Sequence, residues 1–342
     1  MSLAAVLLMA AAVSASPVGR IEVLPHEADR RVDVTIDGKP FTEYLWSEPL
    51  TKPVLFPILT AKGTPVTRGF PLEPRPGERT DHPHQVGLWM SYGDVNGVDF
   101  WNNSPAIPAE QRTKMGHGTH RRIVSATSGR DEGRLRVAIE WTLADGTVVL
   151  DEDTTFIFRR AGEGRSLDRI SRLSARRIPV VFADNKEGFF GMRVARSLEQ
   201  PSKEPATLTD SSGRPTTIEA IDNTGVTGHY RTSEGKEGDA AWGTRARWVA
   251  LSGRVGDEDA TVAMLDHPQN PGAPAYWHAR GYGLFAANPL GQKVFSEGRE
   301  ELNLKLAPHK AVTFRYRVLI LPGTVPAPEL DAAWKMFSRI ER

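Results

Sequence analysis

Strict alternation of apolar and polar residues is the feature of this sequence that most restricts its fold. Apolar side chains occupy every second position at Leu135, Val137, Ile139, Trp141 and Leu143. The pair Asp145-Gly146 comes next, followed by residues 147–158, which are rich in β-branched and aromatic side chains. Apolar residues two positions apart line one face of a strand, and Asp-Gly suits a tight hairpin turn. The pattern predicts a long β-hairpin with one buried face.

One polar residue interrupts the second half of this hairpin. Glu152 shares its parity with Leu150, Phe156 and Phe158, so simple alternation places its carboxylate on the apolar face. A buried carboxylate titrates at high pH and can act as an acid or base. A β-bulge that shifts the parity is the competing explanation.

Similar strand patterns recur along the chain. Val32, Val34 and Ile36 alternate up to Asp37-Gly38, and residues 41–46 can return as the partner strand. Further strands are predicted over residues 247–251, 261–265 and 311–321. The sequence therefore favours antiparallel hairpins over parallel units.

Helical periodicity is convincing only at the end of the chain. Pro328 stands at a helix-start position, and one stripe holds Leu330, Ala333, Trp334, Phe337 and Ile340. Stretches rich in proline and glycine, at residues 63–77 and 268–283, predict long loops. We therefore expect an all-β protein: one large antiparallel β-sandwich domain over residues 16–342, with long loops and a C-terminal helix.

The first fifteen residues are apolar and end in Val13-Ser14-Ala15, a small-residue pattern typical of signal-peptide cleavage. Residues 1–15 are therefore predicted to be a signal peptide, and the mature protein to be periplasmic or extracellular. No later segment reaches the roughly 20 apolar residues of a membrane span, so none is expected.

The composition of the chain limits the partners and the kinds of catalysis that are open to it. The 43 basic and 42 acidic side chains balance, which argues against a nucleic-acid partner. The chain has no cysteine, so a disulfide framework, a thiolate metal site and a cysteine nucleophile are excluded. Catalysis would have to use histidine, carboxylates or hydroxyls.

The densest group of chemically useful residues is the segment Asp81-His82-Pro83-His84. His82 and His84 can face the same side of an extended segment, which suits proton transfer or metal ligation. Histidines that only cap a loop are the structural alternative. We select His82 and His84 as catalytic candidates, with nearby substrate-binding candidates at Trp89, Asn96, Asp99 and Trp101.

Two further segments mix charge with aromatic residues. The first, residues 266–288, could bond sugar hydroxyls and stack on a sugar face, although its aromatics could equally be packed. Its catalytic candidates are Asp266 and His278, and its binding candidates are His267, Asn270, Trp277 and Arg280. The second segment, residues 184–193, contributes the catalytic candidate Glu187 and the binding candidates Lys186 and Arg193, with a solvated hairpin as the alternative.

Several of these motifs together resemble the soluble bacterial family labelled methane oxygenase PmoA. The most specific are His-Pro-His-x-x-Gly-Leu-Trp from His82, Asp-Val-Asn-Gly-Val-Asp-Phe-Trp from Asp94, and Asp-His-Pro-x-Asn from Asp266. The resemblance covers most of the chain after the leader and implies a β-sandwich of unestablished activity, similar to galactose mutarotases by fold analogy. In that family a further histidine often follows His-Pro-His, and Gln85 stands there in this chain, which weighs against a three-histidine metal site.

Methane oxidation does not fit this chain, because the membrane subunit of that name spans the membrane several times, whereas the mean hydropathy here is -0.37. We expect an enzyme acting on a sugar or glycan by acid-base chemistry between histidine and carboxylate, as an epimerase, lyase or hydrolase. The alternatives are a non-catalytic carbohydrate-binding protein that uses tryptophans as stacking platforms, and a metal-dependent enzyme with zinc or copper held by histidines. No cofactor is favoured, and the oligomeric state is left open.

Overall fold

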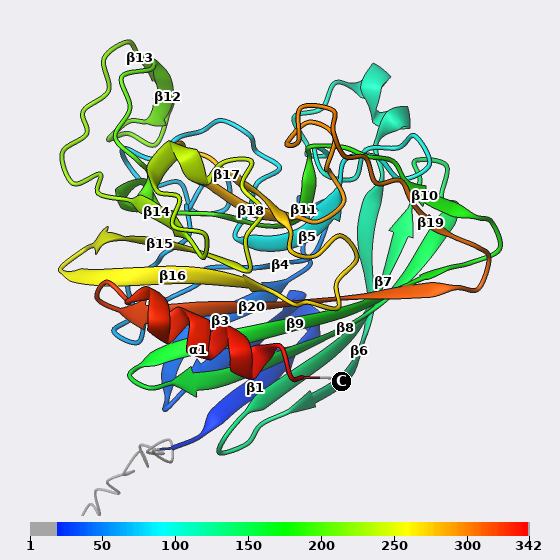
Figure 1. Ribbon diagram of the computed structural model, residues 1–342, viewed down its shortest axis with the longest axis horizontal. Helices are drawn as coiled ribbons and strands as arrows, with labels where there is room; N and C mark the ends of the chain where they lie inside the picture. Colours follow the sequence, from blue (N-terminus) through cyan, green and yellow to red (C-terminus); the bar gives the residue numbers. More distant parts are fainter. Residues whose placement is uncertain (1–18, 341–342) are drawn as a thin grey trace, which may run out of the picture.

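The computed structural model describes residues 19–340 and has two large antiparallel sheets (Figure 1). The first sheet has eight strands, in the spatial order β1 (Ile21–His26), β2 (Arg31–Ile36), β3 (Lys39–Leu45), β4 (Val54–Leu55), β5 (Leu88–Tyr92), β11 (Gly188–Arg193), β18 (Leu284–Asn288) and β17 (Tyr276–Ala279). The second also has eight, in the order β14 (His229–Thr232), β15 (Trp248–Val255), β16 (Glu258–Asp266), β20 (Ala311–Pro322), β9 (Gly164–Ala175), β8 (Val148–Ala161), β7 (Gly133–Thr142) and β6 (His117–Thr127). The predicted all-β sandwich is confirmed.

The remaining elements are short. Two-stranded sheets are formed by β10 (Val180–Phe182) with β19 (Leu304–Leu306) and by β12 (Ala206–Thr209) with β13 (Pro215–Ile218). The 3-10 helices are η1 (Glu27–Asp29), η2 (Ala109–Lys114), η3 (Arg196–Leu198) and η4 (Gly238–Ala241), and the α-helix is α1 (Ala327–Phe337). The signal peptide predicted over residues 1–15 lies outside the described residues.

The main core lies between the two sheets and is built from the alternation seen in the sequence. In β7, the side chains of Leu135, Val137, Ile139 and Trp141 are all buried, while the residues between them are exposed or half-buried. β7 pairs with β8 around the Asp145-Gly146 turn, and β2 pairs with β3 around Asp37-Gly38, as predicted. Both predicted hairpins are therefore confirmed.

Glu152 is buried on the core side of β8, as its parity predicted. Its register with Ile139 is regular, because the only shift in the β7–β8 pairing lies between Trp141 and Thr142. The carboxylate accepts hydrogen bonds from Trp141 Nε1 at 2.7 Å and from Arg169 Nη2 at 2.6 Å. A buried ion pair is tolerated only when hydrogen bonds replace the lost water, and this one meets that condition.

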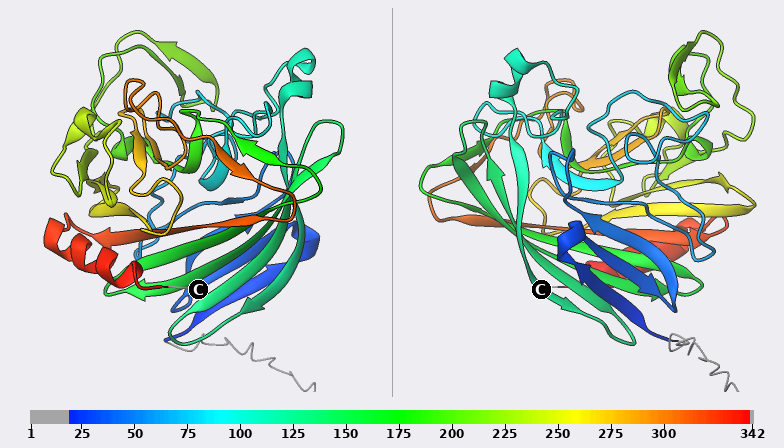
Figure 2. Two further views of the ribbon diagram at one scale, coloured as in Figure 1. Left: turned by 45° about the vertical axis from the view of Figure 1, so that its right-hand side comes forward. Right: turned by 180° about the vertical axis from the view of Figure 1, so that it is seen from behind.

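Helix α1 packs on part of the outer face of the second sheet, over β15, β16 and β20, and the long loops gather on the side of the molecule away from it (Figures 1 and 2). Leu330 and Phe337 of α1 are buried against alternate residues of β15, β16 and β20, including Trp248, Leu265 and Leu319. The predicted stripe on the terminal helix is confirmed. The loop side is therefore where a site can form without disturbing either packed interface.

Candidate functional site

The candidate site lies on the outer face of the first sheet, under its long loops. Along β5, β18 and residues 190–193 of β11, alternate residues point into the main core, and the others face outward. Trp89, Gly191 and Ala286 are cross-strand partners on the outer face. His278 of β17 pairs with Ala286 and so stands on the same face.

Small residues in the middle of this face let a tryptophan lie close to the sheet. A Cβ atom on Gly191 would meet Trp101 Cη2 at 2.9 Å and Trp89 Cζ2 at 3.0 Å. The two tryptophans pack with ring centroids 5.1 Å apart and are fully buried. Both indole Nε1 atoms lack a hydrogen-bond partner among the described residues. These rings form the floor under the loops and do not offer a free face to a ligand.

Asp81 and His82 form a histidine–carboxylate dyad in the loop between β4 and β5. His82 Nδ1 lies 2.7 Å from Asp81 Oδ2. The His82 ring stacks on Tyr282 with a centroid distance of 5.3 Å and an interplanar angle of 1°. His82 has a φ of 45°, which is uncommon for a residue with a side chain and is often found at functional sites. Its side chain is 41% exposed, so a ligand can reach it.

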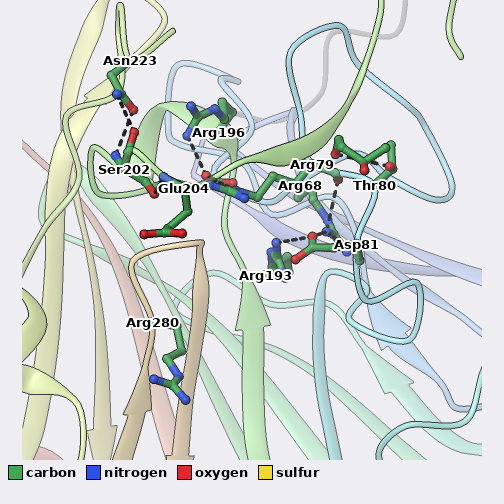
Figure 3. A network of polar contacts seen from close by, with 12 residues as sticks. Arg68, Arg79, Thr80, Asp81, Arg193, Arg196, Ser202, Glu204, Asn223 and Arg280 are labelled. Carbon is green, nitrogen blue, oxygen red and sulfur yellow. Dashed lines mark hydrogen bonds and ion pairs between the residues drawn. The ribbon is translucent and has the colours of Figure 1, made fainter. Parts of the chain in front are cut away.

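Two buried arginines hold Asp81 in place (Figure 3). Arg68 Nη1 donates to Asp81 Oδ1 at 3.0 Å, and Arg193 Nη2 donates to the same oxygen at 2.6 Å. Arg193 also donates to Gln85 Oε1 at 2.5 Å. Gln85, which departs from the pattern of the resembled family, thus helps to orient this arginine.

The charge on Asp81 is fixed by these contacts. Burial alone would raise the pKa of its carboxyl, but the hydrogen bond from His82 and the charges of Arg193 and Arg68 outweigh burial and hold that pKa well below its ordinary value. Asp81 therefore stays a carboxylate through the physiological pH range.

Tyr282 lies beside this dyad and beside residues of the predicted segments 184–193 and 266–288. The guanidinium of Arg193 lies 4.8 Å from the Tyr282 ring centroid. Burial raises the pKa of the Tyr282 hydroxyl; the charges of Arg193 and Arg280 lower it, and those of Glu187 and Asp81 raise it. Arg280 stands two residues before Tyr282, near the turn between β17 and β18.

His278 orients Arg280. Its Nδ1 donates to the carbonyl oxygen of Lys186 at 3.2 Å, and its Nε2 accepts from Arg280 Nε at 3.2 Å. Burial lowers the pKa of His278 to about 4, with opposing effects from Glu187 and Arg280. His278 is therefore neutral at pH 7 with both nitrogens occupied, so we assign it as a positioning residue. Lys186 is exposed and paired with Glu187.

A cavity of about 210 Å³ opens beside the dyad, on the other side of Pro83. His84 and Lys52 both line it, and the His84 ring meets that of His82 edge-on at a centroid distance of 5.6 Å. His84 Nε2 is buried without a hydrogen-bond partner among the described residues. Burial, together with the charges of Lys52 and His82, lowers the pKa of His84 to about 2, so its imidazole is neutral.

Asn96 and Asp99, the other binding candidates predicted near the first segment, form hydrogen bonds with the backbone. Asn96 Nδ2 donates to the carbonyl of Pro179, and its Oδ1 accepts from the backbone of Val181. Asp99 Oδ1 accepts from the backbone nitrogens of Trp101 and Asn102. Both side chains are occupied in shaping the chain, so we leave them out of the site.

Asp266, His267 and Asn270 lie away from the dyad, because they belong to the region under α1. Asn270 Nδ2 donates to Asp266 Oδ1 at 2.7 Å, and the backbone of Ala275 donates to Asp266 Oδ2 at 2.8 Å. Burial raises the pKa of Asp266 to about 7. His267 packs edge-on against Phe337 of α1. The segment that begins at Asp266 does not contact the segment that begins at Asp81. Asp266 ends β16, which belongs to the second sheet, whereas Asp81 lies in a loop over the first sheet.

Trp277 is likewise not part of the site. It points from β17 into the main core, is fully buried, and donates through Nε1 to the carbonyl of Ala246 at 2.9 Å. Its neighbour in sequence, His278, takes the outer face because successive strand residues alternate. None of the three tryptophans proposed as stacking platforms is exposed.

Comparison with known families decides where the chain belongs. The family of unknown function DUF6807 matches residues 31–335. The chain is a member of DUF6807. The matched span includes the Asp81–His82 dyad, Lys52, Tyr282 and the strands that carry the site. Comparison with curated protein sequences finds no significant match.

Several solved structures are similar to this DUF6807 chain. A putative aldose 1-epimerase from Escherichia coli K12 has 11% identity and a TM-score of 0.38, covering 89% of this chain and 100% of that one. Galactose 1-epimerase from Lactobacillus acidophilus NCFM has 8% identity and a TM-score of 0.38, covering 89% and 98%. The galactosidase domain of the alpha-galactosidase-sucrose kinase AgaSK has 9% identity and a TM-score of 0.44, covering 88% and 42%.

Among residues 19–340, no group of three or more histidine, aspartate or glutamate side chains is arranged to hold a metal ion. A zinc or copper site would need a third ligand beside His82 and His84, and His267 lies away from them, against Phe337 of α1. The same range contains no helix long and apolar enough to cross a membrane.

Three residues of the site were missed by the sequence analysis. Lys52 stands between Thr51 and Pro53, Arg68 lies in a glycine-rich loop, and Tyr282 sits in the turn between β17 and β18. None belongs to a spacing pattern, because each reaches the site through contacts distant in sequence. For Tyr282 a weak signal was available: it lies within the aromatic segment that supplied His278 and Arg280.

Proposed function

We propose that this protein is an exported carbohydrate-active enzyme in which His82, oriented by Asp81, transfers a proton to or from the substrate. The observation that carries the proposal is the dyad itself. With a proton on Nδ1 directed at Asp81, the other ring nitrogen of His82 has a lone pair that can take a proton, and the side chain is 41% exposed. A carboxylate that stays ionised stabilises the imidazolium formed when that base takes a proton.

The groups around the dyad suit a substrate with many hydroxyls. Arg280 supplies several N–H donors, Glu187 supplies acceptors, and the Tyr282 hydroxyl can do either. Glu187 is 22% exposed, so it is accessible as the second acid-base group that an epimerase, lyase or hydrolase requires. Arg68 and Arg193 are already bonded to Asp81, so they support the dyad and do not compete for substrate.

The dyad is tested with a panel of free sugars and glycosides, followed by proton NMR for anomer exchange, solvent deuterium incorporation and bond cleavage. His82→Gln is expected to lower the rate by about 10²- to 10⁴-fold, the usual contribution of a general acid or base. His26→Gln is the matched control, because His26 forms a similar pair with Asp33 at 3.1 Å and is 40% exposed.

The His26→Gln variant should retain the rate of the unmodified protein. Equal turnover by the two glutamine variants would overturn the assignment of His82. Absence of turnover from the unmodified protein on every sugar, with binding detected, would replace the enzyme by a carbohydrate-binding protein. Export is tested separately by recovering the protein from the periplasm or medium and sequencing its N-terminus.

A further inference from the structure

We propose that the cavity beside the dyad is a binding site for a small carboxylate with a short apolar tail, held by Lys52 and His84. This site is separate from the sugar chemistry proposed above and does not depend on it. It rests on three observations: a buried amine without a counter-ion, an unpartnered imidazole nitrogen, and apolar walls.

The Lys52 side chain is buried without an acidic partner. Only 6% of the residue is exposed, and Nζ donates one hydrogen bond, to the carbonyl of Trp101 at 2.9 Å. No Asp or Glu oxygen lies within 4.0 Å of Nζ among the described residues. An ammonium group carries three protons, so two remain for a ligand. A buried cation of this kind is stabilised most by an anion.

His84 provides the second contact. It lines the same cavity, is 91% buried, and its Nε2 has no partner among the described residues. Nε2 has almost no accessible surface in the free protein, so the ring has to shift slightly when a ligand oxygen bonds to it. That bond removes the cost of a buried polar atom without a partner. Because neutral imidazole carries one N–H, His84 can donate to a carboxylate oxygen while Lys52 supplies the charge.

The residues that line the cavity indicate the chemical nature of the remainder of the ligand. They are formed by apolar residues for the most part, among them Leu50, Val54, Leu72, Val86 and Ala106. No acidic side chain lines the cavity. At about 210 Å³ it is smaller than the sites that enclose drug-sized molecules. One cation at a polar end and an apolar remainder match a short-chain carboxylate, whereas a sugar ring would leave most hydroxyls without partners.

The charged surroundings set how binding depends on pH. Burial lowers the pKa of Lys52 to about 7, while Asp99 opposes that shift. The other titratable or charged groups nearby are His84 and His117, whose pKa values are both lowered, His82, whose ring meets that of His84, and the Glu152–Arg169 ion pair, which faces Lys52 from the core side. Once His82 is replaced, Lys52 is the group among these that changes charge above pH 7.

The experiment is titration calorimetry of the full chain with butanoate and hexanoate, and with butanol, butanal and butanamide as uncharged probes. Butanoate and hexanoate are expected to bind, and the uncharged probes to bind at least about tenfold more weakly, because they lack the ionic hydrogen bond. Affinity should fall about tenfold per pH unit above pH 7, as the protonated form of Lys52 is lost. The same titration of His82→Gln removes any contribution from the dyad.

Three variants test the residues. Lys52→Met and His84→Gln should each weaken butanoate binding by about 10- to 100-fold. Ala106→Trp, on an exposed part of the cavity wall, should block entry without touching the buried amine. Lys62→Met is the control, since Lys62 is 73% exposed and outside the cavity. Butanoate binding that is equal to butanol binding, or that survives both Lys52→Met and Ala106→Trp, would overturn the proposal.

Sugar turnover and carboxylate binding are measured independently, so the two proposals can fail separately. Loss of turnover in His82→Gln with butanoate binding intact supports both. A covalent adduct between butanal and Lys52, trapped by borohydride, without any butanoate binding would contradict the carboxylate site and assign the amine to carbonyl chemistry instead.

Discussion

Asp81 is bonded to one histidine and two arginines, and this arrangement makes a single carboxylate important for stability. Asp81→Asn would leave Arg68 and Arg193, both nearly fully buried, without their shared anion. Because Asp81 itself is 32% exposed, we expect a loss of about 2 to 3 kcal/mol at pH 7, between the values for buried and surface ion pairs. Urea unfolding followed by tryptophan fluorescence measures it.

The pH dependence of that loss follows from the lowered pKa of Asp81. Its contribution to stability is complete well above the ordinary carboxyl pKa of 3.8 and disappears as the pH falls toward the lower pKa of the folded state. The difference in unfolding free energy between the unmodified protein and Asp81→Asn should therefore shrink as the pH falls below 4. A difference that grows below pH 4 would contradict this account.

Gly191 is a second residue on which the site depends. Gly191→Ala places a methyl group within 3.0 Å of Trp101 and Trp89, in a packed layer that has little room to move. Overpacking of this kind costs about 1 to 3 kcal/mol. The expected result is lower stability together with a shifted tryptophan emission, because the indoles must move. Unchanged stability and emission would show that the layer of Trp89 and Trp101 over Gly191 is packed less tightly than the distances indicate.

At the level of strands, two adjacent carboxylates of β8 form one buried and one exposed ion pair: Glu152 with Arg169 of β9, and Asp153 with Arg136 of β7. Arg169→Leu would leave Glu152 in the core without its ion-pair partner, and the expected cost is about 3 to 5 kcal/mol. Arg136→Leu is the matched control: Arg136 pairs with Asp153, is 50% exposed, and should cost less than about 1 kcal/mol. Equal midpoints of urea unfolding for the two variants would contradict the assignment of Glu152 to the core.

Strand patterns in the sequence predicted the hairpins well, because alternation and turn residues act locally. Val32 to Ile36 and Leu135 to Trp141 face the core as their spacing indicated. The site was harder to predict, since β5, β11 and β18 are buried on both faces and show no alternation. Their neighbours in the sheet come from distant parts of the chain. Thus the meeting of His82 with Tyr282, and of Lys52 with His84, could not be inferred from spacing.

Two segments that share a short motif lie in different parts of the fold. The segments beginning at Asp81 and Asp266 share Asp-His-Pro, yet the first is in a loop over the first sheet and the second follows a strand of the second sheet. A motif gives the local backbone and the chemical groups, while topology decides what they face. The resemblance to the family labelled methane oxygenase PmoA remains a prediction of the same local kind.

At the scale of the whole molecule, the site and helix α1 lie on the outer faces of opposite sheets, with the main core between them. Leu330 of α1 is fully buried under the second sheet, so Leu330→Ala should cost about 2 to 5 kcal/mol. Met336→Ala on the same helix is the control, because Met336 is 64% exposed and should cost less than about 0.5 kcal/mol.

Because the two faces are separate, substitutions on one face and on the other are predicted to have additive effects on stability. Residues without shared contacts usually have additive effects on stability, within about 0.5 kcal/mol. The double variant of Leu330→Ala with Asp81→Asn should therefore lose the sum of the two single losses in urea unfolding, while Leu330→Ala alone keeps the butanoate affinity of the unmodified protein. An interaction energy above about 1 kcal/mol would show instead that the β-sandwich transmits strain from α1 to the loops, and the site would then have to be treated as part of one cooperative unit with the helix.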